Sequence, residues 1–96
     1  MLSPKEKMLA GLAYNASDPT LMAERRRAHT ICHSYNAGGD PSPASLAGLT
    51  AIFKQAGQGL YIEPPFFCDY GYNITMGDRV YLNFNVTVQN HAVFGT

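Results

Sequence analysis

The first half of the chain contains three segments in which apolar residues recur at the three- and four-residue spacing of an α-helix. Each segment is preceded by a helix-capping residue and a proline, at Ser3-Pro4, Asp18-Pro19 and Ser42-Pro43. Proline fits the first turn of a helix, and a Ser or Asp side chain can accept from the free amides there. The pattern therefore predicts three short amphipathic helices, the second running to about Asn36. Helices this short are marginal alone, so they must pack against another part of the chain.

From Ile62 onward the pattern changes to a six-residue period. Every sixth position holds a small or branched apolar residue: Ile62, Cys68, Ile74, Val80, Val86 and Ala92. The residues two positions further along are also mostly apolar. A six-residue repeat indicates one short strand and one turn per repeat, and three repeats close one triangular coil. The alternative is an antiparallel sheet of hairpins, which requires two-residue alternation over longer stretches than this segment shows.

Together the two patterns predict an α+β chain, with a short N-terminal helical cap over residues 1–59 and the first two coils of a parallel β-helix over residues 60–96. In the six-residue register, Ile74 and Val80 point into the coil, whereas Thr75 and Arg79 point outward. The cap helices are then expected to lie against the coil.

The composition and charge of the chain argue against some classes of binding partner. Seven basic residues balance seven acidic ones, so no overall field attracts nucleic acid or an anionic membrane. The one basic cluster, Arg25-Arg26-Arg27, is interpreted as a solvated helix face. No apolar run is long enough to span a bilayer, and the N-terminus lacks a signal-peptide pattern. We therefore expect no nucleic-acid or membrane partner and a cytoplasmic location.

The cysteines and histidines do not form a metal motif. Cys32 and Cys68 lie in different halves of the chain, without a CxxC pattern, and are expected to be buried, reduced thiols. His29 and His33 are four residues apart on a predicted helix, which is a possible ligand spacing, but no third ligand is evident. They are interpreted as surface residues, and no metal is expected.

Several motifs resemble the maltose and galactoside O-acetyltransferase family, one of the hexapeptide-repeat acyltransferases. In the first half they are Lys7–Gly11, Tyr14, Ser17-Asp18-Pro19, Arg25–Ala28 and Tyr35-Asn36; in the second half they are Tyr61–Phe66, Cys68–Ile74 and Asn83-Phe84-Asn85. The resemblance implies a left-handed β-helix, a homotrimer, and acetyl transfer from acetyl-CoA to a hydroxyl of a maltose-, glucose- or galactoside-like sugar. The acceptor and acetyl-CoA would meet between two subunits.

The resemblance also suggests which residues contact the sugar. Asn83 matches an asparagine beside the reacting hydroxyl, and Asp69 falls where relatives place a polar residue that contacts the sugar. Asp18 lies in the cap segment near that site, and Tyr81 is a candidate to line it. Each residue also has a structural interpretation: Asn83 as a turn residue, Asp69 and Asp18 as caps for amides, and Tyr81 as a packing residue.

No catalytic residue is assigned within the chain. The histidine base of the family belongs to a His-Pro dipeptide on a later coil, beyond Thr96, and the coils that hold coenzyme A are expected there too; His91 is too early to be its counterpart. The chain is thus expected to be either a truncated product or a short natural relative. In the second case it is a non-catalytic interaction or assembly module. The sequence does not identify the acceptor sugar or the oligomeric state.

Overall fold

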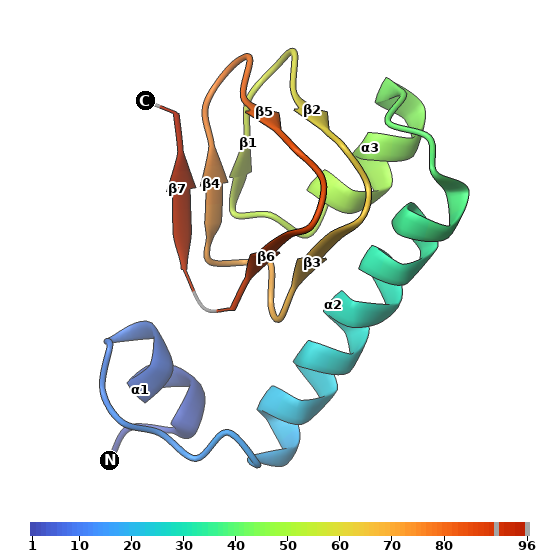
Figure 1. Cartoon of the computed structure of the whole chain (residues 1–96). Coiled ribbons are helices and arrows are strands. Elements are labelled where there is room, and N and C mark those ends of the chain that lie inside the picture. Colours follow the sequence, from blue (N-terminus) through green and yellow to red (C-terminus); the bar gives the residue numbers. More distant parts are fainter. Residues whose placement is uncertain (90, 96) are drawn as a thin grey trace.

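Three helices precede seven short strands in the computed structural model, which describes residues 1–89 and 91–95 (Figure 1). The helices are α1 (Pro4–Leu9), α2 (Pro19–Gly38) and α3 (Pro43–Thr50). All three predicted N-termini are confirmed, with Ser3, Asp18 and Ser42 as the capping residues. Helix α2 ends two residues later than expected, because Gly39 adopts the left-handed conformation (φ 61°) that closes a helix C-terminus.

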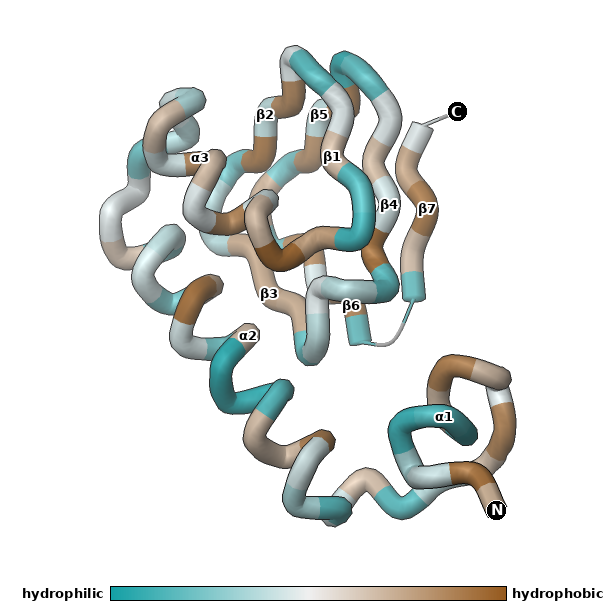
Figure 2. Tube along the Cα trace, turned by 180° about the vertical axis from the view of Figure 1, so that it is seen from behind, coloured by the Kyte–Doolittle hydropathy of each residue, from teal (hydrophilic) through white to brown (hydrophobic). Residues whose placement is uncertain are grey.

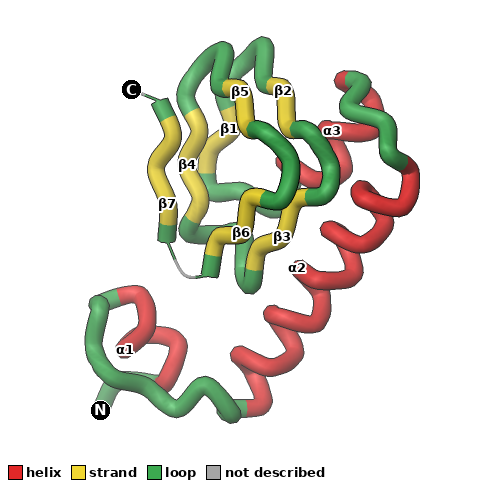
Figure 3. The backbone as a smooth tube through the Cα atoms, viewed as in Figure 1, coloured by secondary structure: helices red, strands yellow, loops and turns green. Residues whose placement is uncertain are grey.

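The strands pair in parallel, and the two partners of each pair are three strands apart along the chain. They are β1 (Gln55–Ala56), β2 (Tyr61–Ile62), β3 (Phe66–Cys68), β4 (Ile74–Met76), β5 (Tyr81–Leu82), β6 (Val86–Val88) and β7 (Ala92–Phe94). The pairs form three sheets, β1–β4–β7, β2–β5 and β3–β6, so the chain passes through three faces before it returns to the first. Figure 3 shows the strands grouped along three sides of a coil. The expected winding of parallel strands is confirmed, and antiparallel hairpin pairing is excluded for these strands.

One paired strand lies within the part of the chain that was expected to form the cap. Strand β1 lies inside the range 1–59 assigned to the cap, yet it pairs with β4 of the next coil. The first paired strand therefore does not coincide with the boundary expected between residues 59 and 60. The other end of the expected range, Thr96, lies outside the described residues.

The spacing between coils is not a uniform eighteen residues. Ile62 pairs with Leu82 and Cys68 with Val88, each twenty residues on, whereas Ile74 pairs with Ala92, eighteen residues on. The strict six-residue register, which would place Val80 above Ile62, is therefore wrong for the first coil. The two additional residues lie between β3 and β4, in a five-residue corner formed by residues 69–73, which we call the long corner.

The apolar side chains of the coil and of the cap form one continuous core. Ile62, Phe66, Cys68, Ile74 and Met76 are each no more than 1% exposed. They pack with the inward faces of α2 and α3 and with Phe53; the cap residues are Ala28, Cys32, Tyr35, Leu46 and Leu49. Figure 2 shows hydrophobic and hydrophilic positions alternating along α2, as expected of a helix with one buried face. The coil thus supplies the apolar surface against which helices this short must pack to be stable.

Helix α2 also covers the backbone of the first coil. Asn36 donates to the carbonyl of Phe66 (2.9 Å) and accepts from the N–H of the same residue (2.8 Å). The neighbouring Tyr35 hydroxyl donates to the carbonyl of Ile62. These side chains supply hydrogen bonds that another strand would otherwise make, so the edges of β2 and β3 are not left open.

The long corner docks α1 and the start of α2. Met8, Leu21 and Tyr70 form a second buried cluster there, with Tyr14 and Tyr72 against it. The corner approaches the segment just after α3 so closely that a Cβ on Gly71, whose φ is +89°, would lie 2.8 Å from Cδ1 of Ile52. Such a contact is too short for any side chain. The two additional residues of the first coil therefore build the attachment of the cap.

Candidate functional site

Two of the expected sugar-contacting residues lie together on the outside of the coil. Tyr81, on β5, is 63% exposed, and its ring stacks on that of Tyr61 at a centroid distance of 4.9 Å. Asn83 follows in the exposed corner between β5 and β6, where its Oδ1 accepts from the N–H of Phe84 (2.9 Å). An amide and an aromatic ring two residues apart on one surface can offer hydrogen bonds and an apolar contact to the same small polar molecule.

The Tyr61 phenol of this stacked pair is hydrogen-bonded to a carboxylate. The Tyr61 hydroxyl donates to a Glu63 carboxylate oxygen at 2.6 Å. This hydrogen bond, with smaller contributions from desolvation and from the negative charge of Glu63, raises the pKa of Tyr61 to about 12. Near neutral pH Tyr61 is therefore uncharged, and its stacked ring and that of Tyr81 form an aromatic platform two residues before Asn83. Phe84, which follows Asn83, is 59% exposed.

Asp69 and Asp18 lie elsewhere in this chain. Asp69 opens the long corner, and its Oδ1 lies 2.8 Å from Nε2 of His29 on α2. Asp18 caps α2, accepting from the amides of Thr20 and Leu21 as expected. His29 is eleven residues beyond Asp18, roughly 16 Å along the helix. A single chain thus brings Tyr81 and Asn83 together and places the two carboxylates along α2.

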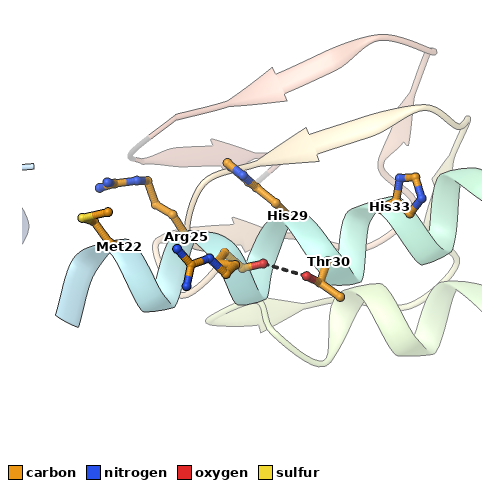
Figure 4. A pocket seen from close by; sticks show the side chains of 6 residues that line it. Met22, Arg25, His29, Thr30 and His33 are labelled. Carbon is orange, nitrogen blue, oxygen red and sulfur yellow. Dashed lines mark hydrogen bonds between the residues drawn. The ribbon is translucent and has the colours of Figure 1, made fainter. Parts of the chain in front are cut away.

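A shallow hollow runs along the exposed side of α2 (Figure 4). Its lining residues come from successive turns of the helix: Met22, Arg25, Arg26, His29, Thr30 and His33. Arg25 is not part of a freely solvated face, as the sequence suggested, because its guanidinium donates to the Tyr70 hydroxyl and to the carbonyl of Ala16, both at 2.7 Å. The hydrogen bond to Tyr70 raises the pKa of Arg25 further. Arg25 and His29 together fix the long corner to α2.

The described part of the chain offers no metal centre. No three His, Cys, Asp or Glu side chains among residues 1–89 and 91–95 are grouped so that they could hold an ion. Within the same residues, no helix is both long and apolar enough to cross a membrane.

Comparison with known proteins decides the family. The model of the maltose acetyltransferase hexapeptide capping motif matches residues 7–57, more than half of the chain. The chain belongs to the maltose acetyltransferase family. The match begins within α1 and ends just after β1, so it covers the last part of α1, all of α2 and α3, and the strand β1.

Individual members extend the likeness through the coil. Nodulation protein L of Rhizobium meliloti (strain 1021) is 42% identical over 89 residues, which are 92% of this chain and 49% of that protein. Nodulation protein L of Rhizobium leguminosarum bv. viciae is 42% identical over 91 residues, 94% of this chain and 48% of the other. The chain therefore spans about half the length of these relatives.

A solved structure of a hexapeptide-repeat-containing acetyltransferase from Vibrio cholerae O1 biovar eltor, complexed with acetyl coenzyme A, shares the fold with a TM-score of 0.83. The two are 27% identical, and the match covers 98% of this chain and 52% of that one. A galactoside acetyltransferase in complex with coenzyme A gives a TM-score of 0.80 at 28% identity, with 98% and 48% coverage. This chain and these two structures thus share the fold of the cap and the first coils.

Sequence reasoning missed two contacts. His29 is exposed, as expected, but its pairing with Asp69 forty residues away was not foreseen. Cys32 and Cys68 were correctly expected to be buried and free, but nothing indicated that they meet. A contact between residues this far apart leaves no local signal in one sequence.

Proposed function

We propose that this chain supplies the acceptor side of an acetyl-CoA-dependent sugar O-acetyltransferase. The observation that supports this most directly is the exposed pair of Asn83 and Tyr81 on the coil of a chain that belongs to the maltose acetyltransferase family. The enzymes with the same fold were solved with acetyl coenzyme A or coenzyme A. The acceptor is a hydroxyl of a maltose-, glucose- or galactoside-like sugar.

Each candidate residue has a chemical role in this proposal. The Asn83 amide donates to the acceptor oxygen as negative charge develops on it, or orients the hydroxyl for attack. The Tyr81 ring packs against the apolar face of the sugar. Asp69, held by His29, and Asp18 accept hydrogen bonds from further hydroxyls, and their negative charge strengthens such bonds. Because the carboxylates lie along α2, they serve a sugar bound beside the cap.

The transfer itself needs a base and the thioester. A base of near-neutral pKa, most often histidine, takes the proton from the sugar hydroxyl. The sugar oxygen then attacks the acetyl carbonyl, and coenzyme A leaves as a thiol. We assign no histidine of this chain to that role: His29 is paired with Asp69, and His91 faces the hollow beside α1. The chain corresponds to only about half of its relatives, so the base and the coenzyme site are assigned to the remaining half of such a protein.

We also propose that the coil is the left-handed β-helix of the hexapeptide-repeat enzymes and that it assembles as a trimer. Support comes from large apolar side chains on the outside of the coil: Phe67, Tyr81, Phe84 and Val93 are between 44% and 63% exposed. Such a surface favours burial against a neighbouring chain. A reducing, cytoplasmic location fits the two free cysteines.

The acceptor role is tested in a chimera in which this chain replaces the matching half of Rhizobium meliloti nodulation protein L. We expect sugar-dependent release of coenzyme A, measured with a thiol reagent. Asn83→Ala should lower kcat about a hundredfold, the typical cost of losing one donor to developing charge. The matched control is Asn85→Gly in the same corner, because glycine readily adopts the left-handed backbone (φ 64°) found at Asn85. Equal rates for the two variants would contradict the proposal.

The alternative function is a non-catalytic assembly module, favoured by the same exposed apolar side chains. Both functions predict self-association, so light scattering alone does not separate them. A strictly monomeric chain over a wide concentration range would exclude the module. The two differ in the chimera: acetyl transfer that depends on Asn83 supports the enzyme, and an assembled chimera that transfers no acetyl to any of the sugars supports the module. The 96-residue chain alone should release no coenzyme A.

A further inference from the structure

Two buried cysteines meet where the cap lies on the coil. Cys32 is on the inward face of α2 and Cys68 ends β3; they are 2% and 1% exposed. Their sulfur atoms lie 3.6 Å apart, although 36 residues separate them in the chain. Both are free thiols. A disulfide requires about 2.05 Å between the sulfurs, so a movement of about 1.5 Å would join them.

The pair is buried but not sealed. A hollow of about 270 Å³ lies beside it, lined by His29, Cys32, His33, Phe67 and Cys68. This space admits a molecule the size of water or a small peroxide. The two thiols are the nucleophilic side chains that border this space.

The contact between the thiols also prepares one of them to react. The hydrogen bond between the two sulfurs lowers the pKa of Cys32, against the opposing effects of burial and of Asp69, and the interaction with His29 acts in the same direction as the hydrogen bond. The hydrogen bond to Cys32, together with burial, raises the pKa of Cys68. The contact between the sulfurs favours ionisation of Cys32 over ionisation of Cys68, and two adjacent thiols of this kind can act as an attacking and a resolving cysteine.

We propose that Cys32 and Cys68 are a redox-sensitive pair, which hydrogen peroxide converts to a disulfide that fastens α2 to β3. The Cys32 thiolate attacks one peroxide oxygen, the O–O bond breaks, and the released hydroxide takes up a proton to form water. The sulfenic acid left on Cys32 is then attacked by the sulfur of Cys68, which loses its proton, and a second water leaves. Two thiols are oxidised, and one peroxide is reduced to two waters.

The bond would tie the cap to the coil covalently. It encloses α3, β1 and β2 in a loop that runs from Cys32 to Cys68. Closing a loop of this length restrains the unfolded chain, so the oxidised protein should melt about 15 °C or more above the reduced one. The inference does not depend on the acetyltransferase proposal, since it concerns only the contact between cap and coil.

The folded chain is treated with hydrogen peroxide, quenched with an alkylating reagent and analysed by mass spectrometry. We expect a mass lower by two hydrogen atoms, no alkylated cysteine, a peptide that links Cys32 to Cys68, and the higher melting temperature. Sulfinic acid on either cysteine, a disulfide between two chains, or reaction only after unfolding in urea would each overturn the proposal.

A single-cysteine variant tests the order of events. In Cys68→Ser, the sulfenic acid on Cys32 has no resolving partner, so a dimedone-type reagent should trap it in the folded state. In the matched variant Cys32→Ser, Cys68 should react much more slowly, and equal trapping would contradict the assigned order. If either variant fails to fold, the mass and the linked peptide of the unmodified chain still decide whether the pair forms a disulfide.

Discussion

Replacing Asn36 by alanine tests how much the amide of one side chain contributes to the stability of the contact between cap and coil. The Asn36 side chain makes both a donated and an accepted hydrogen bond to the backbone of Phe66, a residue with no exposed surface. Alanine would leave the buried N–H and C=O of Phe66 without these partners. An unsatisfied buried polar group costs about 1–3 kcal/mol.

The magnitude follows from the position of the residue. Asn36 is itself only partly buried, so water can reach the site after truncation, and the lower end of that range applies to each group. We expect a loss of about 2 kcal/mol in the free energy of unfolding, partly offset by about 0.5 kcal/mol from the higher helix propensity of alanine. Urea denaturation followed by far-UV circular dichroism measures the difference.

Ser34→Ala is the matched control, since it lies on an exposed part of the same helix and gains the same propensity. Tyr35→Phe is an independent test of the same edge: it removes the hydrogen bond to the buried Ile62 carbonyl and should cost about 1 kcal/mol. If Asn36→Ala, corrected by Ser34→Ala, changed the stability by less than about 0.5 kcal/mol, the claim that α2 takes the place of a strand would be wrong.

Two further substitutions test the coil. Gly57→Ala should destabilise the protein by about 2 kcal/mol or more, because the new Cβ would lie 2.4 Å from the backbone of Gly77. The control Gly48→Ala lies in open space on α3 and should be neutral or stabilising. Thermal melts of the two variants measure the difference. Ile74→Asp places a charge at a position that is 1% exposed, so it should lower the free energy of unfolding by several kcal/mol. Thr75→Asp, on the opposite face of β4, should lower it by less than about 1 kcal/mol. Equal losses for the two variants would contradict the assigned direction of the side chains.

The helix starts were predictable because their signals are local. A capping side chain and a proline act on amides within one turn, so Ser3, Asp18 and Ser42 could be identified without knowledge of the fold. The six-residue pattern was also sufficient to predict parallel coils. It could not show the twenty-residue offset, because Val80 and Leu82 are both apolar and either can stand above Ile62. The pairing of Ile62 with Leu82 depends on the length of a corner that the pattern skips.

The same distinction between local and distant signals applies to the residues of the candidate site. Tyr81 and Asn83 are neighbours in the sequence, so their common surface follows from the strand and corner that carry them. Asp69 depends on how the long corner meets α2, and its contact with His29 arises only when cap and coil are assembled. A residue whose surroundings come from distant segments cannot be placed by spacing alone.

The irregular length of the long corner has a consequence for redesign. An engineer who idealised this protein would delete two of residues 69–73, which would give every coil the same eighteen-residue length. The regularised coil would keep its strands, but Tyr70 and Gly71 would no longer reach Arg25 and Ile52. Helix α1 and the start of α2 would then lose their anchor, while the rest of the cap would still pack on the coil. The departure from perfect repetition is therefore the part of the coil that recognises this end of the cap.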